Sequence, residues 1–287
     1  MTIIHRLLFI ALILPATAVQ ATGTEDGNAP SAPRFKIEIA GSFDYSPSKL
    51  TGNHSVITSP DGVVESDLTA TKEDLHLLNR RNTYKLEQQT VDLRLSYRIY
   101  KQLHVWAGVG VVSSSACNRY TDSDEEVRSK SVSENPEFLL KGGLSYTHPL
   151  RCGFFVALRP AVAYSHDNNT LLKLYPQEGE NNVYSDFGMS RKVIRWEVPL
   201  IVGKQIGRFT PYAGVAYKDF RQTDRLETES QYIDQMYRVE ATDTFRSRSK
   251  IHGLAGTTFS LASNIGIGLT ASFSRSIAAE LTFHLSL

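Results

Sequence analysis

The stretch Ile251–Leu287, which reads IHGLAGTTFSLASNIGIGLTASFSRSIAAELTFHLSL, decides the fold of this chain. From Ile265 onward its apolar residues occupy every second position, with one interruption near Ser274–Ser276, and small, polar or charged residues stand between them. Because successive side chains of a β-strand point to opposite faces, this period of two predicts strands with one apolar and one polar face. Such strands suit a boundary between lipid and water.

This ending resembles the closing strand of small bacterial outer-membrane β-barrel proteins, the opacity-like, OmpA-like and porin-like barrels. In that family, alternating apolar residues run up to an aromatic residue at the terminus, where this chain has Leu287. The resemblance implies an all-β fold, a closed antiparallel transmembrane β-barrel with long outer loops and short periplasmic turns, located in the bacterial cell outer membrane. It implies an architecture rather than an activity.

Composition narrows the class of protein. The chain has 287 residues, and its 31 Lys and Arg are scattered and nearly balanced by 30 Asp and Glu, so no nucleic-acid partner is indicated. The mean hydropathy of -0.24 is too low for a helical membrane protein, and beyond the N-terminal segment there is no run of about 18 apolar residues. A barrel fits this hydropathy because half of each strand faces the lumen.

The N-terminal segment has the features of a secretory signal peptide. Arg6 precedes an apolar run over residues 7–14, and small residues follow. Such a segment is removed on export, here after Ala21 or after Ala18. The predicted organisation is a signal peptide over residues 1–21, a flexible segment over residues 22–33 and an outer-membrane β-barrel over residues 34–287.

The same alternation predicts further strands upstream of the C-terminal stretch. They cover residues 34–45, 91–99, 103–111, 137–146, 154–164, 194–202, 209–220 and 250–261. Long polar segments without a sustained apolar pattern cover residues 46–84, 113–135, 167–190 and 221–247. Long and short connections alternate, which is typical of barrels with long outer loops and short periplasmic turns. We predict about ten strands, with eight or twelve left open.

Aromatic residues on the apolar faces predict two rings at the heights of the two membrane interfaces. The ring near the short turns contains Phe35, Tyr97, Tyr146, Phe154, Phe209 and Phe259. The ring near the long loops contains Phe43, Tyr45, Phe138, Tyr164, Tyr217 and Phe273. A soluble β-barrel, which is the competing interpretation, has no reason to sort its aromatic residues by height.

Charged residues on the opposite faces are expected to line the lumen. The predicted lumen charge network consists of Glu38, Asp92, Arg94, Arg98, His104, Glu137, Lys141, Arg159, Arg195, Glu197, Lys218, Lys250, His252, Glu280 and His284. Unpaired charges at this density are unfavourable in the dry core of a soluble barrel, whereas in a lumen they meet one another or water. The set therefore favours the outer-membrane interpretation.

The two cysteines, Cys117 and Cys152, are expected to be free thiols. The predicted topology places Cys117 in an outer loop and Cys152 in a periplasmic turn. An apolar band of about 25 Å separates these ends, whereas a disulfide requires Cα atoms within about 7 Å.

The sequence offers only weak candidates for catalysis. Asp122 and Asp124 have the spacing of the paired acids in omptin-like protease barrels, but no Asp-x-His motif accompanies them. Lipid-modifying barrels use a histidine and a serine two positions apart. Here Ser165 and His166 are adjacent, so on a strand they point to opposite faces and cannot share a proton. Asp44 at the rim of the first predicted strand, and His166 with Asp167 at the rim of the fifth, are further candidates for a carboxylate and an imidazole that meet at one height.

No cofactor or metal is predicted. The acidic segment at residues 122–126 lacks the glycine and the spacing of a calcium-binding loop, and it is better explained as a solvated surface.

The sequence therefore predicts a non-enzymatic outer-membrane barrel with a structural or surface-interaction role carried by its long extracellular loops. Its expected partners are outer-membrane lipid, lipopolysaccharide and a surface or host ligand bound by the loops. The first alternative is a narrow, anion-preferring, porin-like channel, because basic residues outnumber acidic ones on the predicted lumen face. The last alternative is a lipid-modifying enzyme or protease acting at the rim. The loop ligand and the oligomeric state are left open.

Overall fold

The structure is a computed structural model, and it describes residues 35–122, 125–133, 135–175, 187–232 and 235–287. The chain divides into two units, residues 1–32 and 33–287, and every described residue belongs to the second unit. The predicted signal peptide and flexible segment lie outside the described residues. No helix in the described part of the chain is long and apolar enough to span a membrane.

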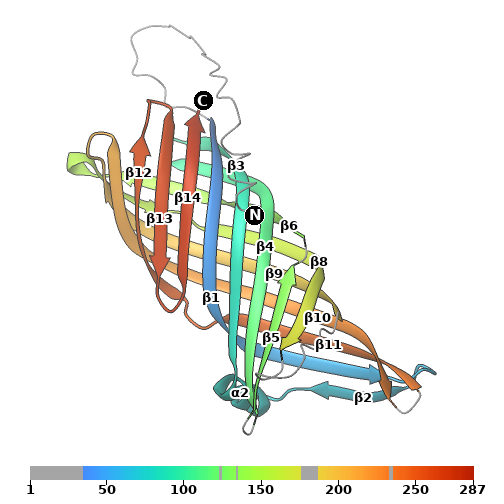
Figure 1. Ribbon diagram of the computed structural model, residues 1–287. Helices are drawn as coiled ribbons and strands as arrows, with labels where there is room; N and C mark the ends of the chain where they lie inside the picture. Colours follow the sequence, from blue (N-terminus) through green and yellow to red (C-terminus); the bar gives the residue numbers. More distant parts are fainter. Residues whose placement is uncertain (1–34, 123–124, 134, 176–186, 233–234) are drawn as a thin grey trace. The chain divides into compact units, whose positions relative to one another are not determined.

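The second unit is built almost entirely of antiparallel β-strands (Figure 1). Its strands and helices are β1 (Phe35–Thr58), β2 (Val64–Thr69), α2 (Lys72–Arg81), β3 (Thr83–Tyr100), β4 (Leu103–Asp122), β5 (Glu125–Ser133), β6 (Glu137–Pro149), the 3-10 turn η1 (Arg151–Gly153), β7 (Phe154–Leu158), β8 (Ala161–Tyr175), β9 (Phe187–Lys204), β10 (Phe209–Tyr232), β11 (Gln235–Ser247), β12 (Ile251–Ser260), β13 (Ile265–Phe273) and β14 (Ile277–Ser286).

The strand pairings form a ring. Strand β1 pairs with β14 on one side and with β3 on the other. From β3 the pairings continue through β4, β6, β7 with β8, β9, β10, β12 and β13, and they return to β14. The C-terminal stretch that decided the fold supplies β12, β13 and β14, which stand together in red and orange in Figure 1.

The structure corrects the prediction that the long connections carry no strands, because the described residues contain fourteen strands, whereas the ring itself passes through ten positions when β7 and β8 are counted as one. Three of them, β2, β5 and β11, lie in segments that were predicted to be polar loops. Strands β1, β4, β8 and β10 also continue far into those segments, and β3 and β9 enter them by a few residues. The sequence pattern missed them because, away from lipid, the exposed face of a strand needs no apolar residues.

The fifth predicted strand, residues 154–164, is divided into β7 and β8 at Arg159 and Pro160. Proline has no backbone N–H and interrupts a strand ladder. The gap is still bonded to its neighbours, because Arg159 N donates to the carbonyl of Pro199 and Leu144 N donates to the carbonyl of Pro160.

The apolar side chains of the ring point outward. Val109 is 50% exposed, Leu144 is 44% exposed and Leu281 is 56% exposed. The residues that alternate with them along the strands point to the other face and are less exposed. Asp92 on that face retains only 2% of its accessible surface. This is the reverse of a soluble barrel, which buries its apolar face.

Three strands of the ring end early. Strand β1 pairs with β14 over residues 36–45 and then with β11 over residues 48–58. Strand β10 likewise changes its partner from β12 to β11 beyond Tyr217. One strand, β11, therefore replaces β12, β13 and β14 at the level where those strands end, so the sheet changes width there (Figure 1).

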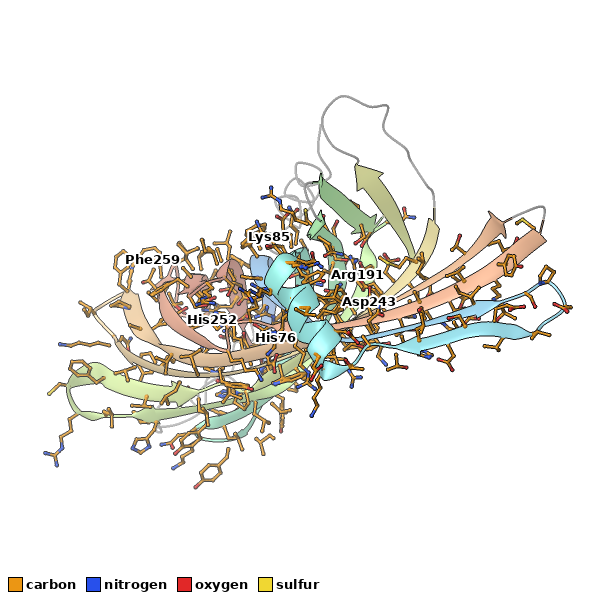
Figure 2. The ribbon with its side chains drawn as sticks, turned by 90° about the horizontal axis from the view of Figure 1, so that it is seen from below. His76, Lys85, Arg191, Asp243, His252 and Phe259 are labelled. Carbon is orange, nitrogen blue, oxygen red and sulfur yellow. The ribbon has the colours of Figure 1, made fainter. Side chains whose placement is uncertain are left out.

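Helix α2 covers part of the end that carries these strand extensions (Figure 2). It begins with a capping box in which Thr71 and Asp74 bond reciprocally. Asn79 bonds both the N–H and the carbonyl of Leu50 on β1, and Arg248 donates to the carbonyls of Asn79 and Asn82. These bonds fix the helix to the strands beneath it.

Candidate functional site

The inner charge cluster consists of Lys36, Glu38, Asp92, Arg94, Lys141 and Glu280. Arg94 is its centre, and its guanidinium lies 2.5 Å from Asp92, 3.0 Å from Glu38 and 2.6 Å from Glu280. Lys141 reaches the same Asp92 at 2.6 Å. With three cations and three carboxylates the cluster is neutral, and each charge has a partner.

Small residues on β4 make room for this cluster. A side chain at Gly108 would lie 3.1 Å from Arg94 Cγ, and one at Gly110 would lie 2.6 Å from Asp92 Cβ. The two glycines therefore let the side chains of β3 lie across β4 toward Lys141 on β6. Trp106 lies on the same face, and its ring is 5.4 Å from the Arg94 guanidinium.

Other polar contacts join strands that are not neighbours in the sheet, so they must cross the interior. Arg195 on β9 donates to Asp44 on β1 at 2.7 Å and to Gln88 on β3 at 2.6 Å. Lys218 on β10 donates to Ser272 on β13 at 3.1 Å, and it also lies 3.2 Å from Glu197, its register partner on the adjacent strand β9.

An apolar plug follows these charges toward the α2 end. It consists of Leu86 on β3, Ala116 on β4, Val193 on β9 and Phe220 on β10, all at most 3% exposed. Strands on opposite sides of the ring contribute to it, so it fills the interior. A second cluster, Leu50, Tyr84 and Phe245, packs against Leu75 and Leu78 of α2. The predicted lumen set contained none of these residues.

A buried network around Arg191 was also missed by the sequence. Arg191 has no exposed surface, and it donates to Asp224 at 3.0 Å and 3.1 Å and to Ser131 at 2.5 Å. Nearby, Asp243 stands opposite Asp224 in the β10–β11 register. Burial raises the pKa of the Asp243 carboxyl, Asn53 opposes that shift by donating to it, and Asp224 adds to it. No sequence signal marks this set, because its members lie in segments without an apolar pattern.

Several predicted lumen residues require correction. Lys250 precedes β12, is 41% exposed and pairs with Asp219 at 2.9 Å beside the Tyr217 ring, so it lies outside the interior. Alternation along a strand predicts which face a side chain is on only for residues within that strand. Lys250 lies just before β12, so the alternation does not apply to it. Arg159, at the β7–β8 break, is exposed, yet it acts electrostatically on His104 of the interior face and is not among the misplaced residues. Glu137 is buried, but it bonds Ser114 and Ser133 near the outer end rather than the inner charge cluster.

The remaining predicted residues occupy the interior face around the cluster. His284 stands opposite Glu38 in the β1–β14 register, and Arg98 stands opposite His104 in the β3–β4 register. His252 is buried and is held by Ser274 and Ser276 of the β13–β14 turn.

The predicted interface aromatics lie on the exposed face. Phe35, Phe43, Tyr97, Phe138, Tyr146, Phe154, Phe209, Tyr217 and Phe273 are all at least 38% exposed, and Tyr45, Tyr164 and Phe259 are partly exposed. At the α2 end, lysine side chains lie over the rings of three of them. The pairs are Lys85 over Tyr45, Lys192 over Tyr164 and Lys250 over Tyr217.

The catalytic candidates do not assemble. Ser165 is buried and its neighbour His166 is exposed, as expected for adjacent residues on a strand. Asp44 is engaged by Arg195. The side chains of the acidic segment at residues 122–126 lie outside the described residues. Among the residues that the structure describes, no group of three or more His, Cys, Asp or Glu is placed to hold a metal ion.

No protein-family model matches the chain, and no curated protein sequence matches it. Among solved structures, the chain is similar to the translocator domain of the autotransporter NalP from Neisseria meningitidis, with 8% identity over 99% of this chain and 96% of that one, at a TM-score of 0.38. It is also similar to the outer membrane protein OprG from Pseudomonas aeruginosa, with 10% identity over 91% and 100% of the two chains, at a TM-score of 0.35. The outer membrane protease OmpT from Escherichia coli matches with 9% identity over 86% and 97%, at a TM-score of 0.39.

Proposed function

We propose that this chain is a non-enzymatic, closed transmembrane β-barrel of the bacterial outer membrane whose interior is plugged and whose work is done by the strand extensions at the α2 end. In this proposal the short turns face the periplasm, and the extensions and α2 face the cell exterior. The barrel holds those extensions in place, and they make contact with a partner at the surface.

The observation that carries the membrane placement is the inverted distribution of side chains. Apolar residues such as Val109 and Leu281 are about half exposed, while Arg94 and Asp92 are covered. Exposing an apolar belt to water is unfavourable by roughly 25 cal/mol per Å², and a surrounding lipid bilayer removes that cost. The matching experiment is membrane fractionation combined with gel migration before and after heating. We expect an outer-membrane protein whose migration changes on heating, and a heat-insensitive protein recovered from the periplasm would contradict the proposal.

The plugged interior is supported by the contacts that cross it. The neutral inner charge cluster, the Arg195 contacts to Asp44 and Gln88, and the apolar plug occupy successive levels along the strands. About ten strands enclose a space only slightly wider than side chains can fill. The excess of basic residues that favoured an anion-preferring channel is reduced, because Lys250 lies outside and Asp44, which was not in the predicted set, neutralises Arg195.

Planar-bilayer recordings test the plug directly. We expect no stepwise conductance from the wild-type protein, because ion pairs and apolar side chains block the path. The double variant Arg195→Ala/Phe220→Ala removes two groups that cross the interior, and it should produce transient conductance. Regular anion-selective steps from the wild type would instead support the channel alternative.

Labelling of the two natural cysteines tests the orientation. Both are free; Cys117 on β4 is partly exposed near the α2 end, and Cys152 is exposed in the turn between β6 and β7. A maleimide too large to cross the outer membrane should label Cys117 in intact cells and label Cys152 only after permeabilisation. Cys117→Ser and Cys152→Ser variants identify each signal. Labelling of Cys152 in intact cells would show the opposite orientation.

A contact role for the extensions is supported by apolar residues exposed beyond the membrane belt. Val63, just before β2, and Val64, its first residue, are 54% and 57% exposed, and Leu68 is 63% exposed. Leu77 on α2 is 53% exposed. Exposed apolar groups on a fixed scaffold are common at protein-binding surfaces.

A further inference from the structure

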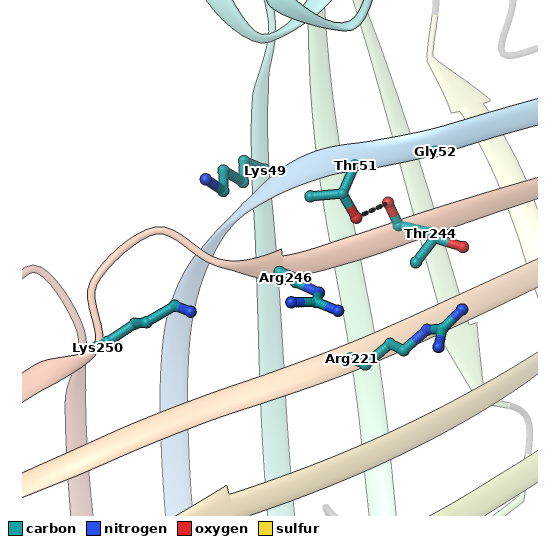
Figure 3. Close-up of a pocket in the computed structure, with 7 residues that line it drawn as sticks. All are labelled: Lys49, Thr51, Gly52, Arg221, Thr244, Arg246 and Lys250. Atoms are coloured by element: carbon teal, nitrogen blue, oxygen red, sulfur yellow. Dashed lines mark hydrogen bonds between the residues drawn. The ribbon is translucent and has the colours of Figure 1, made fainter. Parts of the chain in front are cut away.

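A basic pocket opens at the level where β11 replaces β12, β13 and β14. Its volume is about 490 Å³, and its basic residues are Lys49 on β1, Arg246 on β11, Arg221 on β10 and Lys250 just before β12 (Figure 3). Its wall contains a hydrogen bond of 3.1 Å from the Thr51 hydroxyl to the Thr244 carbonyl. Four basic side chains from four segments of the chain therefore surround one recess.

The pocket faces away from the interior. Lys49, Arg221 and Arg246 are exposed, while the residues next to them in sequence, Leu50 and Phe245, belong to the buried cluster beneath α2. Because strand residues alternate between faces, the basic side chains point to the outer surface of the sheet.

Three of these cations stand in one row without acidic partners. Arg246 is the direct register partner of Lys49 on one side and of Arg221 on the other. Like charges placed directly opposite each other in a sheet are destabilising. In the described part of the chain, none of the three forms an ion pair, and Asp219, two residues before Arg221 on β10, is engaged by Lys250. Farther along the same strands, by contrast, Arg225 and Arg238 pair with Glu227 and Glu240.

The height of the pocket matches lipid headgroups. Lys49 follows Tyr45 by four residues, and Arg221 follows Tyr217 by four residues. On a strand tilted by about 40°, four residues of about 3.3 Å each rise about 10 Å above the interface aromatics. Lys250 reaches back toward that interface, with its ammonium 5.8 Å from the Tyr217 ring. The cations therefore cover the polar zone directly outside the hydrocarbon core.

We propose that the basic pocket binds the phosphorylated headgroup of an anionic lipid of the outer leaflet, and that a phosphate monoester is preferred over a diester. This inference rests on the proposed membrane placement. Arginine guanidinium groups bind phosphate oxygens through paired hydrogen bonds, and ammonium groups add point charges. A dianionic phosphate would also relieve the repulsion along the row of Lys49, Arg246 and Arg221.

The test is native mass spectrometry of the full protein in detergent micelles, titrated with phosphatidic acid, phosphatidylglycerol or phosphatidylcholine. We expect retention to decrease in that order, with phosphatidic acid held at least about tenfold more tightly than phosphatidylcholine. The variant Lys49→Gln/Arg221→Gln/Arg246→Gln should lose at least about tenfold in affinity for phosphatidic acid. Its resistance to unfolding should equal or exceed that of the wild type, because it removes repulsion and breaks no ion pair.

The control variant is Arg225→Gln/Arg238→Gln, which removes two cations that already have acidic partners, and it should bind phosphatidic acid like the wild type. Inorganic phosphate is added as a competitor, and displacement of the lipid by phosphate at equal concentration would assign the pocket to free phosphate and overturn the lipid source. Equal binding of phosphatidic acid by the wild type and the Lys49 triple variant would overturn the site itself. Heat-modifiable migration of the same samples reports separately on the barrel, so a failed lipid test leaves the membrane proposal standing.

Discussion

Replacing Arg94 with methionine is expected to lower the free energy of unfolding by about 3–5 kcal/mol. The guanidinium contacts Asp92, Glu38 and Glu280, and the Asp92 side chain has no exposed surface. Without Arg94, three carboxylates share a confined interior, and Lys36 and Lys141 neutralise only part of their charge. The size of this loss in stability comes from leaving buried carboxylates without their cation, and not from the net stabilisation that the ion pairs provide.

The measurement is urea unfolding in lipid vesicles, followed by heat-modifiable migration. Arg98→Met is the matched control, because Arg98 lies on the same face of β3 and, within the described residues, has no carboxylate partner at ion-pair distance. We expect that variant to remain within about 1 kcal/mol of the wild type. Similar losses for both variants would mean that the bulk of the side chain, and not its charge, matters at this position.

Replacing Arg191 with methionine should also cost about 3–5 kcal/mol, because it leaves Asp224 buried without its cation. Arg191 is fully buried, and Asp224 stands opposite Asp243, whose carboxyl is also buried. Removing Arg191 therefore leaves two carboxyl groups facing each other in a covered space.

The double variant Arg191→Met/Asp224→Leu distinguishes the causes. If the penalty comes from the unpaired carboxylate, the second substitution should restore the stability to within about 1 kcal/mol of the wild type. Arg221→Met, at an exposed position on the neighbouring strand β10, controls for the loss of an arginine side chain that is not buried. A double variant less stable than Arg191→Met would show that the hydrogen bonds to Ser131 and Gln222 carry the effect instead.

The candidate site was only partly readable from the sequence. Arg94, Glu38 and Glu280 could be assigned to one face because each lies within a strand of period two, but their convergence depends on the stagger of β1, β3 and β14. The apolar plug was missed because Leu86, Val193 and Phe220 belong to different strands. In the sequence nothing local to any one of them shows that they meet. Lys250 was misplaced because the predicted strand was one residue too long at its start. Strand β12 begins at Ile251, so Lys250 precedes it.

The sequence by itself determined the strand class and the two faces. Alternation is a local property, fixed by the geometry of one extended chain, so Ile265 to Leu287 and the matching segments upstream already show which side chains face the same way. The tertiary structure alone decided what those faces meet. Only the pairing of strands far apart in the chain brings Arg195 to Asp44 and places α2 over Tyr84. The same pairing extends β1 and β10 past the membrane belt. It also gathers Lys49, Arg221 and Arg246 around one recess. These contacts depend on register and ring closure, and no periodicity within a single segment encodes either of them.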